Sequence, residues 1–399
     1  MLKWWPVHPL SGPLPMIRDA LLDDLDALVA LENRCFDHDR LSRRNFRYML
    51  TKANAATLVE EHKGELRGYV LLLFHTGTSL ARMYSLAVDP ASRGHGIAAK
   101  LIKAAEHAAL ARGRVYMRLE VRPDNAAAIA LYQKLNYRQF GVVDDYYEDH
   151  ADALRFEKLM VPHLRPELVR VPYYEQTLDF TCGPAALMMA MQALDDSVDM
   201  SRQTEIRIWR EATTVFMTSG HGGCGAHGLA LSAYHRGFDV EIYVKDETPM
   251  FVDSVRNEEK KEVIRLVQDE FIQEVAALPI AEHYTKLGVD DLKSQFNSGG
   301  IPIVLISSYR IYKEKSPHWV VVTGFDERFI YVHDPFVDYD MGKTRMDCIN
   351  MPILQSDFDR MARYGKSAQR AALIVRRRST TRRRRLVKKR GVRREAKRS

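Results

Sequence analysis

The stretch Ser85-Leu-Ala-Val-Asp-Pro-Ala-Ser-Arg-Gly-His-Gly-Ile-Ala98 decides the fold of the first half of the chain. Apolar residues alternate from Ala81 to Val88, which predicts a strand, and Asp89-Pro90 ends it. From Ala98 to Arg112 the apolar residues recur at helical spacing. The residues in between therefore form a turn that leads into a helix N-terminus, where free amides and the helix dipole suit a pyrophosphate.

A glycine turn of this kind also fits other kinds of phosphate site. The run from Gly94 to Ala99 matches a relaxed dinucleotide fingerprint, and Glu120 lies roughly 20 residues beyond it. Three features oppose that interpretation. The turn follows an antiparallel hairpin expected at 55–61 and 68–74, no second dinucleotide half follows, and Glu120 leads straight into another helix. The Walker pattern fails because no Lys-Ser/Thr follows the glycines.

These residues resemble the GNAT N-acetyltransferases, and within them the RimI-like ribosomal-protein alanine N-acetyltransferases. Arg93-x-x-Gly96-x-Ala98 is similar to the pyrophosphate loop of the family. Leu119-Glu-Val-Arg-Pro-Asp-Asn-Ala-Ala-Ala-Ile-Ala-Leu-Tyr132 is similar to the second RimI-like motif. The resemblance covers about residues 16–160 and implies an α/β (α+β) domain with a mixed sheet.

The resemblance implies acetyl-CoA as cosubstrate, together with the residues that hold it. These are Leu86, Ala87, Val88, Arg93, Gly94, His95, Gly96, Ile97, Ala98 and Asn125. It also implies Glu120 as the general base for the incoming amine and Tyr132 as the acid that protonates the departing thiolate. An amine must lose a proton before it attacks a thioester, so a carboxylate helps. A surface carboxylate at Glu120 and a core aromatic at Tyr132 remain the structural alternatives.

Length and composition indicate a second domain. The chain has 399 residues, of which 46% are hydrophobic, and this fits two domains with cores of their own. No window resembles a membrane span, and no secretory signal is visible. The cysteines form no Cys-x-x-Cys pair, so neither a zinc site nor a disulfide framework is expected. We therefore expect a cytoplasmic protein without a metal and without a membrane partner.

Positive charge is concentrated at the C-terminal end. Residues 376–399 hold 14 Lys and Arg and one Glu, whereas residues 1–375 hold 45 Lys and Arg and 51 Asp and Glu. Such a run cannot bury apolar surface and is predicted to be disordered. One hypothesis is that it contacts RNA, the ribosome or an acidic partner through counterion release. The alternative is a merely solubilising end, and the lack of interleaved aromatic residues argues against base stacking.

A second set of candidate residues surrounds Cys182. The sequence places Cys182 immediately before a helix that Gly183-Pro184 begin, and the positive end of the helix dipole favours a thiolate there. Gln176 is an amide donor that could face an oxyanion. His318 begins an apolar strand and Asp334 follows the next one, so both are expected at one edge of a hairpin. A base and its orienting group require that arrangement.

In chain order these residues resemble the papain-like cysteine peptidases, specifically the family that removes double-glycine leader peptides from bacteriocin precursors. The resemblance covers roughly residues 170–365. It implies Gln176 as the oxyanion donor, Cys182 as the nucleophile, His318 as the general base and acid, and Asp334 as the orienting group. Taken singly, each residue also has a purely structural interpretation. The best-known members are fused to a membrane ABC exporter, which is not seen here, so the domain could cleave a peptide or only bind one.

Two further stretches belong to the second domain. The glycine-rich run at 220–231 resembles a segment that precedes a helix in these peptidases. His221 and Cys224 within it lack an accompanying carboxylate or second cysteine cluster, so no metal is predicted. Apolar residues at helical spacing predict a helical insertion within residues 250–300.

The predicted organisation is an irregular extension at 1–15, a GNAT domain at 16–160, a linker at 161–169, a cysteine peptidase-like domain at 170–375 and a basic disordered tail at 376–399. The predicted function is acetyl-CoA-dependent acetylation of a peptide or protein α-amino group, combined with peptide cleavage. In one alternative the second domain only recruits peptides. In another the chain acetylates ribosomal or small-molecule amines, and the remaining parts localise it.

Overall fold

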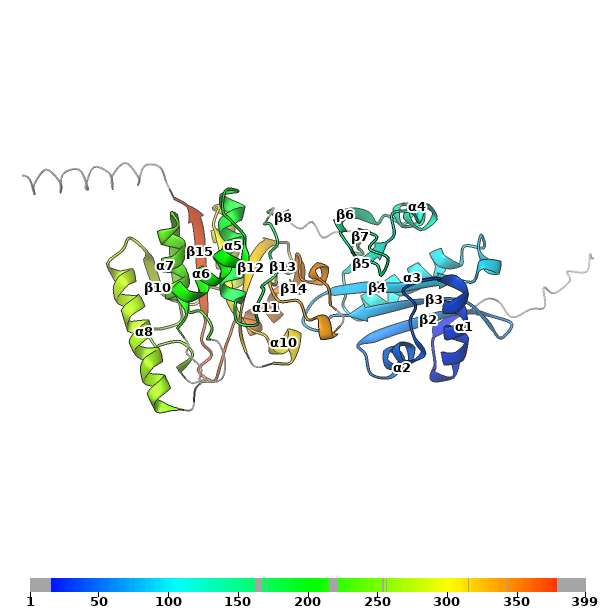
Figure 1. Cartoon of the computed structure of the whole chain (residues 1–399), viewed down its shortest axis with the longest axis horizontal. Coiled ribbons are helices and arrows are strands. Elements are labelled where there is room, and N and C mark those ends of the chain that lie inside the picture. Colours follow the sequence, from blue (N-terminus) through cyan, green and yellow to red (C-terminus); the bar gives the residue numbers. More distant parts are fainter. Residues whose placement is uncertain are drawn as a thin grey trace, which may run out of the picture. The chain divides into compact units, whose positions relative to one another are not determined.

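The computed structural model describes residues 16–161, 167–169, 171–214, 222–252, 255, 257–314, 316–341 and 343–378. The chain divides into two compact units, Met1–His163 and Leu164–Ser399, and the division falls within the segment predicted as a linker (Figure 1). The predicted extension at 1–15 lies outside the described residues. The tail from residue 379 onward also lies outside the described residues. Its predicted contact with RNA, the ribosome or an acidic partner therefore stays a prediction.

The first unit is built on a mixed seven-stranded sheet in the order β1-β2-β3-β4-β5-β7-β6, in which only β4 and β5 pair in parallel. Its strands are β1 (Met16–Asp19), β2 (Ala55–His62), β3 (Glu65–Phe74), β4 (Leu80–Val88), β5 (Tyr116–Val121), β6 (Arg138–Val143) and β7 (Ala153–Leu159). Its helices are α1 (Leu25–Cys35), α2 (Arg43–Thr51), α3 (Ile97–Ala111) and α4 (Ala126–Lys134), with short 3-10 helices at Leu22–Asp24 and Pro90–Ser92. The predicted mixed α/β fold is confirmed.

The central strand β3 shows how the sheet is covered on both faces. Val70 and Leu72 pack into a core with α3 and α4, whereas Tyr69 and Leu71 face a second core with α1 and α2. This alternation is what a strand covered on both sides requires. Gly68 in β3 allows α3 to lie close to the sheet, because a Cβ there would come within 3.0 Å of Leu101 Cδ1 and 3.1 Å of Ile97 Cγ2, both on α3.

The second unit contains a sheet in the order β10-β9-β15-β11-β12-β13-β14, to which β8 adds by pairing with β12. Its strands are β8 (Glu167–Leu168), β9 (Phe238–Val244), β10 (Ala281–Tyr284), β11 (Ile301–Ser307), β12 (Pro317–Phe325), β13 (Phe329–His333), β14 (Met351–Leu354) and β15 (Ala371–Arg377). Its helices are α5 (Cys182–Leu194), α6 (Arg202–Ala212), α7 (Ala226–His235), α8 (Glu258–Ala276), α9 (Val289–Asn297), α10 (Tyr309–Tyr312) and α11 (Gln355–Met361), with 3-10 helices at Tyr339–Met341 and Arg345–Asp347.

Helix α5 forms the centre of the second unit. Every residue from Cys182 to Met191 is buried, as expected for a helix that is apolar on all sides, and it packs against β11, β12 and β15. The helix begins at Cys182 itself rather than at Gly183, with Thr181 as N-cap. The predicted start was therefore one residue late, because Gly183 and Pro184 occupy the second and third positions of the first turn, where proline is still tolerated.

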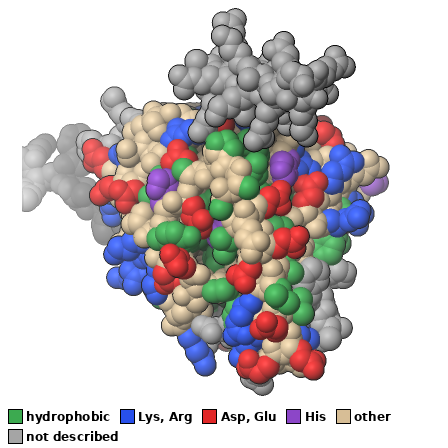
Figure 2. All heavy atoms as spheres, turned by 90° about the vertical axis from the view of Figure 1, so that its left-hand side faces the viewer, with side chains coloured by type: hydrophobic (Ala, Val, Ile, Leu, Met, Phe, Trp, Pro, Cys, Tyr) green, Lys and Arg blue, Asp and Glu red, His purple; other side chains and the backbone are tan. Residues whose placement is uncertain are grey.

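The predicted helical insertion contains helix α8 and helix α9, but a strand separates them. Strand β10 pairs in parallel with β9 and so extends the sheet at its edge. Figure 2 shows a face of the molecule on which side chains of both charge signs alternate with small apolar patches.

At the C-terminal end of the described chain, β15 continues to Arg377, beyond the predicted start of the tail. Arg377 and Arg378 donate to the carbonyls of Leu194 and Tyr234, both at 2.8 Å.

Candidate active sites

In the first unit, strands β4 and β5 separate part-way along their length. Their register joins only Leu80–Arg82 with Tyr116–Arg118. Beyond that point β4 keeps β3 as its partner and β5 keeps β7, but the two strands no longer pair with each other. The edge of β4 that carries Leu86, Ala87 and Val88 is therefore left without a strand on that side. Backbone groups on such an edge are available to a ligand.

The predicted phosphate turn has the geometry that a ligand would need. Gly94 and Gly96 have φ values of 83° and 71°, and a Cβ at either position would meet nothing within 4 Å. Gly96 is the N-cap of α3, and no side chain caps the helix there. The first amides of α3 therefore suit an anion. Arg93 is exposed, and its Nε donates to the Val88 carbonyl at 3.4 Å.

Two other residues predicted to contact the cofactor have local roles in this turn and in α4. Asn125 is the N-cap of α4, because its Oδ1 accepts from the Ala128 amide at 3.1 Å. The exposed ring of His95 turns back to the loop, with its Nδ1 3.0 Å from the Arg93 carbonyl oxygen. The Asn125 side-chain nitrogen makes no hydrogen bond within the described part of the chain and remains available to a ligand.

Glu120 lies between two buried arginines. Arg82 Nε donates to Glu120 Oε2 at 2.9 Å, and Arg155 Nε lies 3.7 Å from Oε1. The same Arg82 donates through Nη2 to Tyr146 Oη at 2.6 Å. The side chain of Glu120 is only 6% exposed, so the alternative of a surface carboxylate is wrong. An amine that approaches Glu120 must compete with the Arg82 guanidinium.

Tyr132 is buried in the core between the sheet and the helices. Its ring centroid lies 5.8 Å from that of Tyr137 and 6.2 Å from that of Phe156. Burial raises the pKa of the Tyr132 phenol above its ordinary value. The phenol therefore stays protonated at neutral pH, as a proton donor must. Packing and proton donation are compatible at this position.

In the second unit, Cys182, His318 and Asp334 come together although they are far apart in the sequence. His318 Nε2 donates to Asp334 Oδ1 at 2.6 Å, and the side chains are 8% and 0% exposed. A hydrogen bond joins the same imidazole to Cys182. Because Nε2 faces Asp334, the other ring nitrogen, Nδ1, is left for the thiol. A thiol beside an imidazole that a carboxylate orients can act as a nucleophile.

The electrostatics of this buried pair follow from its contacts. Burial alone would lower the pKa of His318, but the charge and hydrogen bond of Asp334, and the hydrogen bond with Cys182, together raise it to about 10. Burial alone would raise the pKa of the Asp334 carboxyl, but the charge and hydrogen bond of His318 hold it below its ordinary value. An imidazolium beside a carboxylate is therefore the favoured state at neutral pH.

The elements that carry these residues explain why they meet. Helix α5 begins at Cys182, β12 begins one residue before His318, and β13 ends one residue before Asp334. The antiparallel register pairs Val321 with His333, which puts the start of β12 and the end of β13 at one edge. The hairpin arrangement predicted from the sequence is present.

Gln176 is tied to the same edge through its backbone. Its amide donates to the Pro335 carbonyl at 2.9 Å, next to Asp334, and its side chain is buried. Its Nε2 donates one hydrogen to the Leu178 carbonyl at 2.9 Å, which leaves a second hydrogen on that nitrogen. Gln176 Oε1 is buried without a partner among the described residues.

Sequence reasoning missed the residues that hold this site in place. Tyr312 Oη donates to Asp334 Oδ2 at 2.6 Å. Glu205, which is completely buried, accepts hydrogen bonds from three residues just before Cys182. A signal existed for Glu205, because it shares the apolar face of α6 with Ile208 and Ala212. No comparable pattern marks Tyr312.

Comparison with known proteins gives the two families. Residues 171–376 match the family described as "Peptidase_C39 like family". The chain belongs to this family. Residues 23–137 of the same chain match the Acetyltransferase (GNAT) family, so it joins a GNAT domain to a C39-like domain.

The GNAT domain is similar to acetyltransferases of several organisms. The N-terminal acetyltransferase complex ARD1 subunit homolog of Dictyostelium discoideum is 31% identical over 41% of this chain and 80% of its own length. An N-alpha-acetyltransferase of Sulfurisphaera tokodaii is 32% identical over 34% of this chain and 88% of its own length. The crystal structure of the ribosomal-protein-S18-alanine N-acetyltransferase from Escherichia coli aligns with 38% of this chain and 99% of its own, with 23% identity and a TM-score of 0.34.

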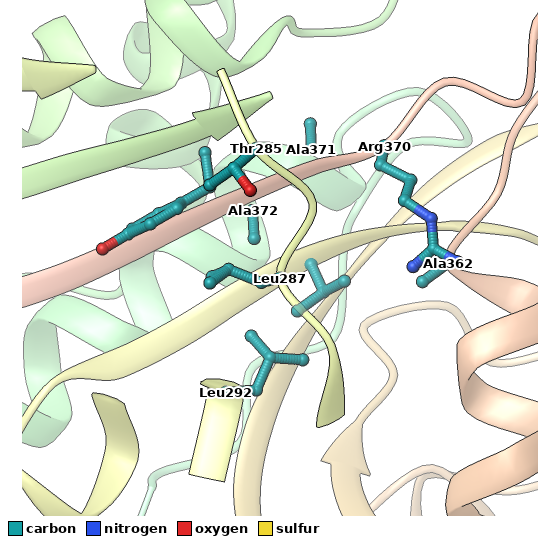
Figure 3. A pocket seen from close by; sticks show the side chains of 9 residues that line it. Thr285, Leu287, Leu292, Ala362, Arg370, Ala371 and Ala372 are labelled. Carbon is teal, nitrogen blue, oxygen red and sulfur yellow. The ribbon is translucent and has the colours of Figure 1, made fainter. Parts of the chain in front are cut away.

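A small pocket in the C39-like domain lies away from the candidate catalytic residues. Leu287, Leu292 and Arg370 help to line it (Figure 3). Its volume is about 10 Å³, which is about the space that one water molecule needs. The Arg370 guanidinium is already engaged by Asp359, with Nη1 3.0 Å from Oδ1. This pocket is therefore a packing feature of the domain.

Three other features describe the cysteines, the metal-binding groups and the helices of the chain. All four cysteines are free thiols. The described residues contain no group of three or more His, Cys, Asp and Glu side chains that could hold a metal ion, and His221 lies outside them. No helix within the described ranges is both long and apolar enough to cross a membrane.

Proposed function

We propose that the GNAT domain acetylates an α-amino group of a peptide or protein and that the C39-like domain cleaves a peptide with Cys182 as nucleophile. The observation that carries the second part is the buried imidazole of His318 between Cys182 and Asp334. The first part is supported by the relatives whose names specify N-terminal and N-alpha-acetyltransferases. The four free thiols suit a reducing compartment, so we propose a cytoplasmic location.

Acetyl-CoA would supply the acetyl group as an activated thioester. The unpartnered edge of β4 at Leu86–Val88 would bind it through the backbone, and the run Arg93–Ala98 would hold its pyrophosphate at the N-terminus of α3. The positive φ of Gly94 and Gly96 leaves room for close approach. Asn125 would contribute its side-chain nitrogen.

At the acceptor side, Glu120 would take a proton from the incoming ammonium, directly or through water. For this the ammonium would replace the Arg82 guanidinium on Oε2, so one cation exchanges for another at a buried carboxylate. Arg82 would keep its contact with Tyr146 Oη during that exchange. Tyr132, protonated at neutral pH, would give its proton to the departing thiolate.

In the C39-like domain, Cys182 Sγ would attack the scissile carbonyl carbon while the thiol proton resides on His318 Nδ1. His318 would then deliver that proton to the leaving amine, and Asp334 would keep the imidazole oriented. The developing oxyanion would accept from the second hydrogen on Gln176 Nε2 and from the backbone at the N-terminus of α5. Water would hydrolyse the thioester and regenerate the thiol.

A single mass-spectrometric experiment tests both parts. The protein is incubated with acetyl-CoA and peptides that carry a free α-amino group and an internal Gly-Gly sequence. We expect Glu120→Gln to lower the acetylation rate by about 10²–10⁴-fold and to leave cleavage intact. We expect Cys182→Ala to abolish cleavage and to leave acetylation intact. Cleavage that persists in Cys182→Ala would refute the proposed nucleophile, and peptide capture without cleavage by the unmodified protein would favour the recruiting alternative.

The same experiment shows whether the two reactions are connected. A tethered acetyltransferase meets the new N-terminus of a cleavage product at a raised effective concentration. An acetyl group on that new terminus, formed faster than on the same peptide added free, would demonstrate the connection.

The phosphate turn gives a separate prediction. Gly96→Val should raise the KM for acetyl-CoA by about tenfold or more, because a β-branched residue is strained at positive φ and adds bulk where the ligand approaches. Gly64→Val is the matched control. Gly64 also has a positive φ, 80°, with open space around it, but it lies in the β2–β3 turn. The control should lose a similar amount of stability and keep its KM, and an equal rise in both variants would contradict a role for Gly96 in binding.

A further inference from the structure

The carboxylate of Asp334 is held on both oxygens. Oδ1 accepts from His318 Nε2 at 2.6 Å and from the Phe336 amide at 2.9 Å, and Oδ2 accepts from Tyr312 Oη at 2.6 Å. Asp334 is completely buried. Among the described residues, Tyr312 Oη is the donor that Oδ2 has, so Oδ2 would have none without this bond. A buried carboxylate oxygen without a donor is strongly disfavoured.

Tyr312 is itself fixed from several sides. Its ring packs edge-on against Phe336 and His318, with centroid distances of 5.0 and 6.0 Å. Lys343 Nζ lies 4.1 Å from the centre of the ring, and Lys343 is only 6% exposed. Such a cation over an aromatic face is attractive. The hydroxyl is therefore delivered to Asp334 from a rigid position, on helix α10, which contains none of the predicted catalytic residues.

We infer that Tyr312 is a positioning residue of the proposed peptidase site: it orients the Asp334 carboxylate so that Oδ1 faces His318 and keeps that carboxylate ionised. The inference rests on the proposed function of Cys182 and His318. Tyr312 acts through Asp334 and His318 and has no contact of its own with the thiol in the described geometry. Burial and the charge of Asp334 raise the pKa of the Tyr312 phenol, so it remains a donor at every pH relevant to catalysis.

The groups that face this assembly come from several elements. Cys182 on α5 bonds the imidazole, and Cys348 lies near Asp334, with its carbonyl accepting from the Asp334 amide at 2.9 Å. The Lys343 ammonium is the nearby cation on the Tyr312 side. Tyr173 Oη donates to the Asp334 backbone carbonyl at 3.0 Å, not to its carboxylate. Tyr173 is therefore a suitable control, because its hydroxyl contacts Asp334 without bonding to the carboxylate.

Removing the Tyr312 hydroxyl has a predictable sign. A carboxylate that loses a donor is harder to ionise, so the acid form of Asp334 persists to higher pH. Without the bond to Tyr312 the carboxylate is also free to turn away from His318, and a less well-paired imidazolium activates the Cys182 thiol less. The acid limb of Cys182 reactivity in Tyr312→Phe should therefore move upward by about one pH unit or more, since one unit corresponds to the loss of a single charged hydrogen bond.

The test is the pH profile of Cys182 alkylation by iodoacetamide, in which Sγ displaces iodide and the modified peptide is quantified by mass spectrometry. It needs no peptide substrate and uses the full chain. Relative to the unmodified protein, we expect an upward shift of the profile in Tyr312→Phe and no shift in Tyr173→Phe. Hydrogen exchange of β12 and β13 verifies that each variant is folded.

The possible outcomes separate the two proposals. If Tyr312→Phe keeps the profile of the unmodified protein, or if Tyr173→Phe shifts it equally, Tyr312 has no positioning role and the proposed nucleophile stands. If Cys182 in the unmodified protein is alkylated no faster than the other three free cysteines, the proposed peptidase site itself is wrong. An unfolded Tyr312→Phe would also overturn the inference, because loss of one hydroxyl would then act on folding rather than on orientation.

Discussion

Replacing Glu205 by alanine is expected to destabilise the C39-like domain by roughly 2–4 kcal/mol. Glu205 is completely buried and accepts from the Thr177 amide at 2.8 Å and from Thr181 Oγ1 at 2.5 Å. Thr177 Oγ1 at 2.6 Å and Tyr174 Oη at 3.0 Å are the other two donors. Hydrogen bonds to a charged acceptor are stronger than neutral ones, and alanine would leave these donors and a cavity behind.

Domain-resolved hydrogen exchange would measure this loss without interference from the GNAT domain. The segment before Cys182 and helix α6 should exchange faster, whereas α3 and β3 should be unchanged. Glu211→Ala is the control on the same helix, because Glu211 pairs with Arg236 near the surface. Such a pair contributes at most about 1 kcal/mol. Equal losses in both variants would show that Glu205 is not the residue that secures this segment.

Asp334→Asn is expected to lower the rate of peptide cleavage on the order of 10⁴-fold, although the nucleophile Cys182 stays in place. An amide in place of the carboxylate removes the charge that raises the pKa of His318 and can present a donor instead of an acceptor to Nε2. The imidazole would then adopt the wrong tautomer or the wrong orientation. The rate of peptide cleavage, measured with and without the substitution, checks this expectation.

Asp326→Asn provides the matched comparison within the same hairpin. Asp326 is also buried and accepts from the Arg328 and Phe329 amides at 2.7 Å, but it caps the turn between β12 and β13 at the opposite end from His318. It should lower stability and leave the cleavage rate of the folded protein nearly unchanged. If Asp326→Asn reduced cleavage as strongly as Asp334→Asn, the loss would reflect a damaged hairpin and not a lost orienting charge.

The structural features that the sequence predicted are those defined by short-range patterns. The glycine turn between a strand and a helix is a local feature, and its positive φ values at Gly94 and Gly96 are what only glycine adopts easily. The meeting of His318 with Asp334 followed from two consecutive strands and their turn. These features need no knowledge of distant contacts.

The residues that were missed depend on contacts between distant segments. Arg82 reaches Glu120 across 38 positions and Tyr146 across 64. Each of the two arginines beside Glu120 lies in the interior of a strand, where a charge signals a buried partner without identifying it. Tyr312 lies on a helix of only four residues, too short to produce a periodic signal. Neither spacing nor composition could have placed its hydroxyl on Asp334.

The position of Cys182 as the first residue of a buried helix has a consequence for the durability of the site. Helix α5 packs against three strands of the sheet and is buried from Cys182 to Met191. A nucleophile on a loop can be displaced by local opening at little cost, but one on the central helix moves only when the core opens. The surroundings that would activate Cys182 and the integrity of the domain are therefore lost together, so local opening alone would not disable the proposed site.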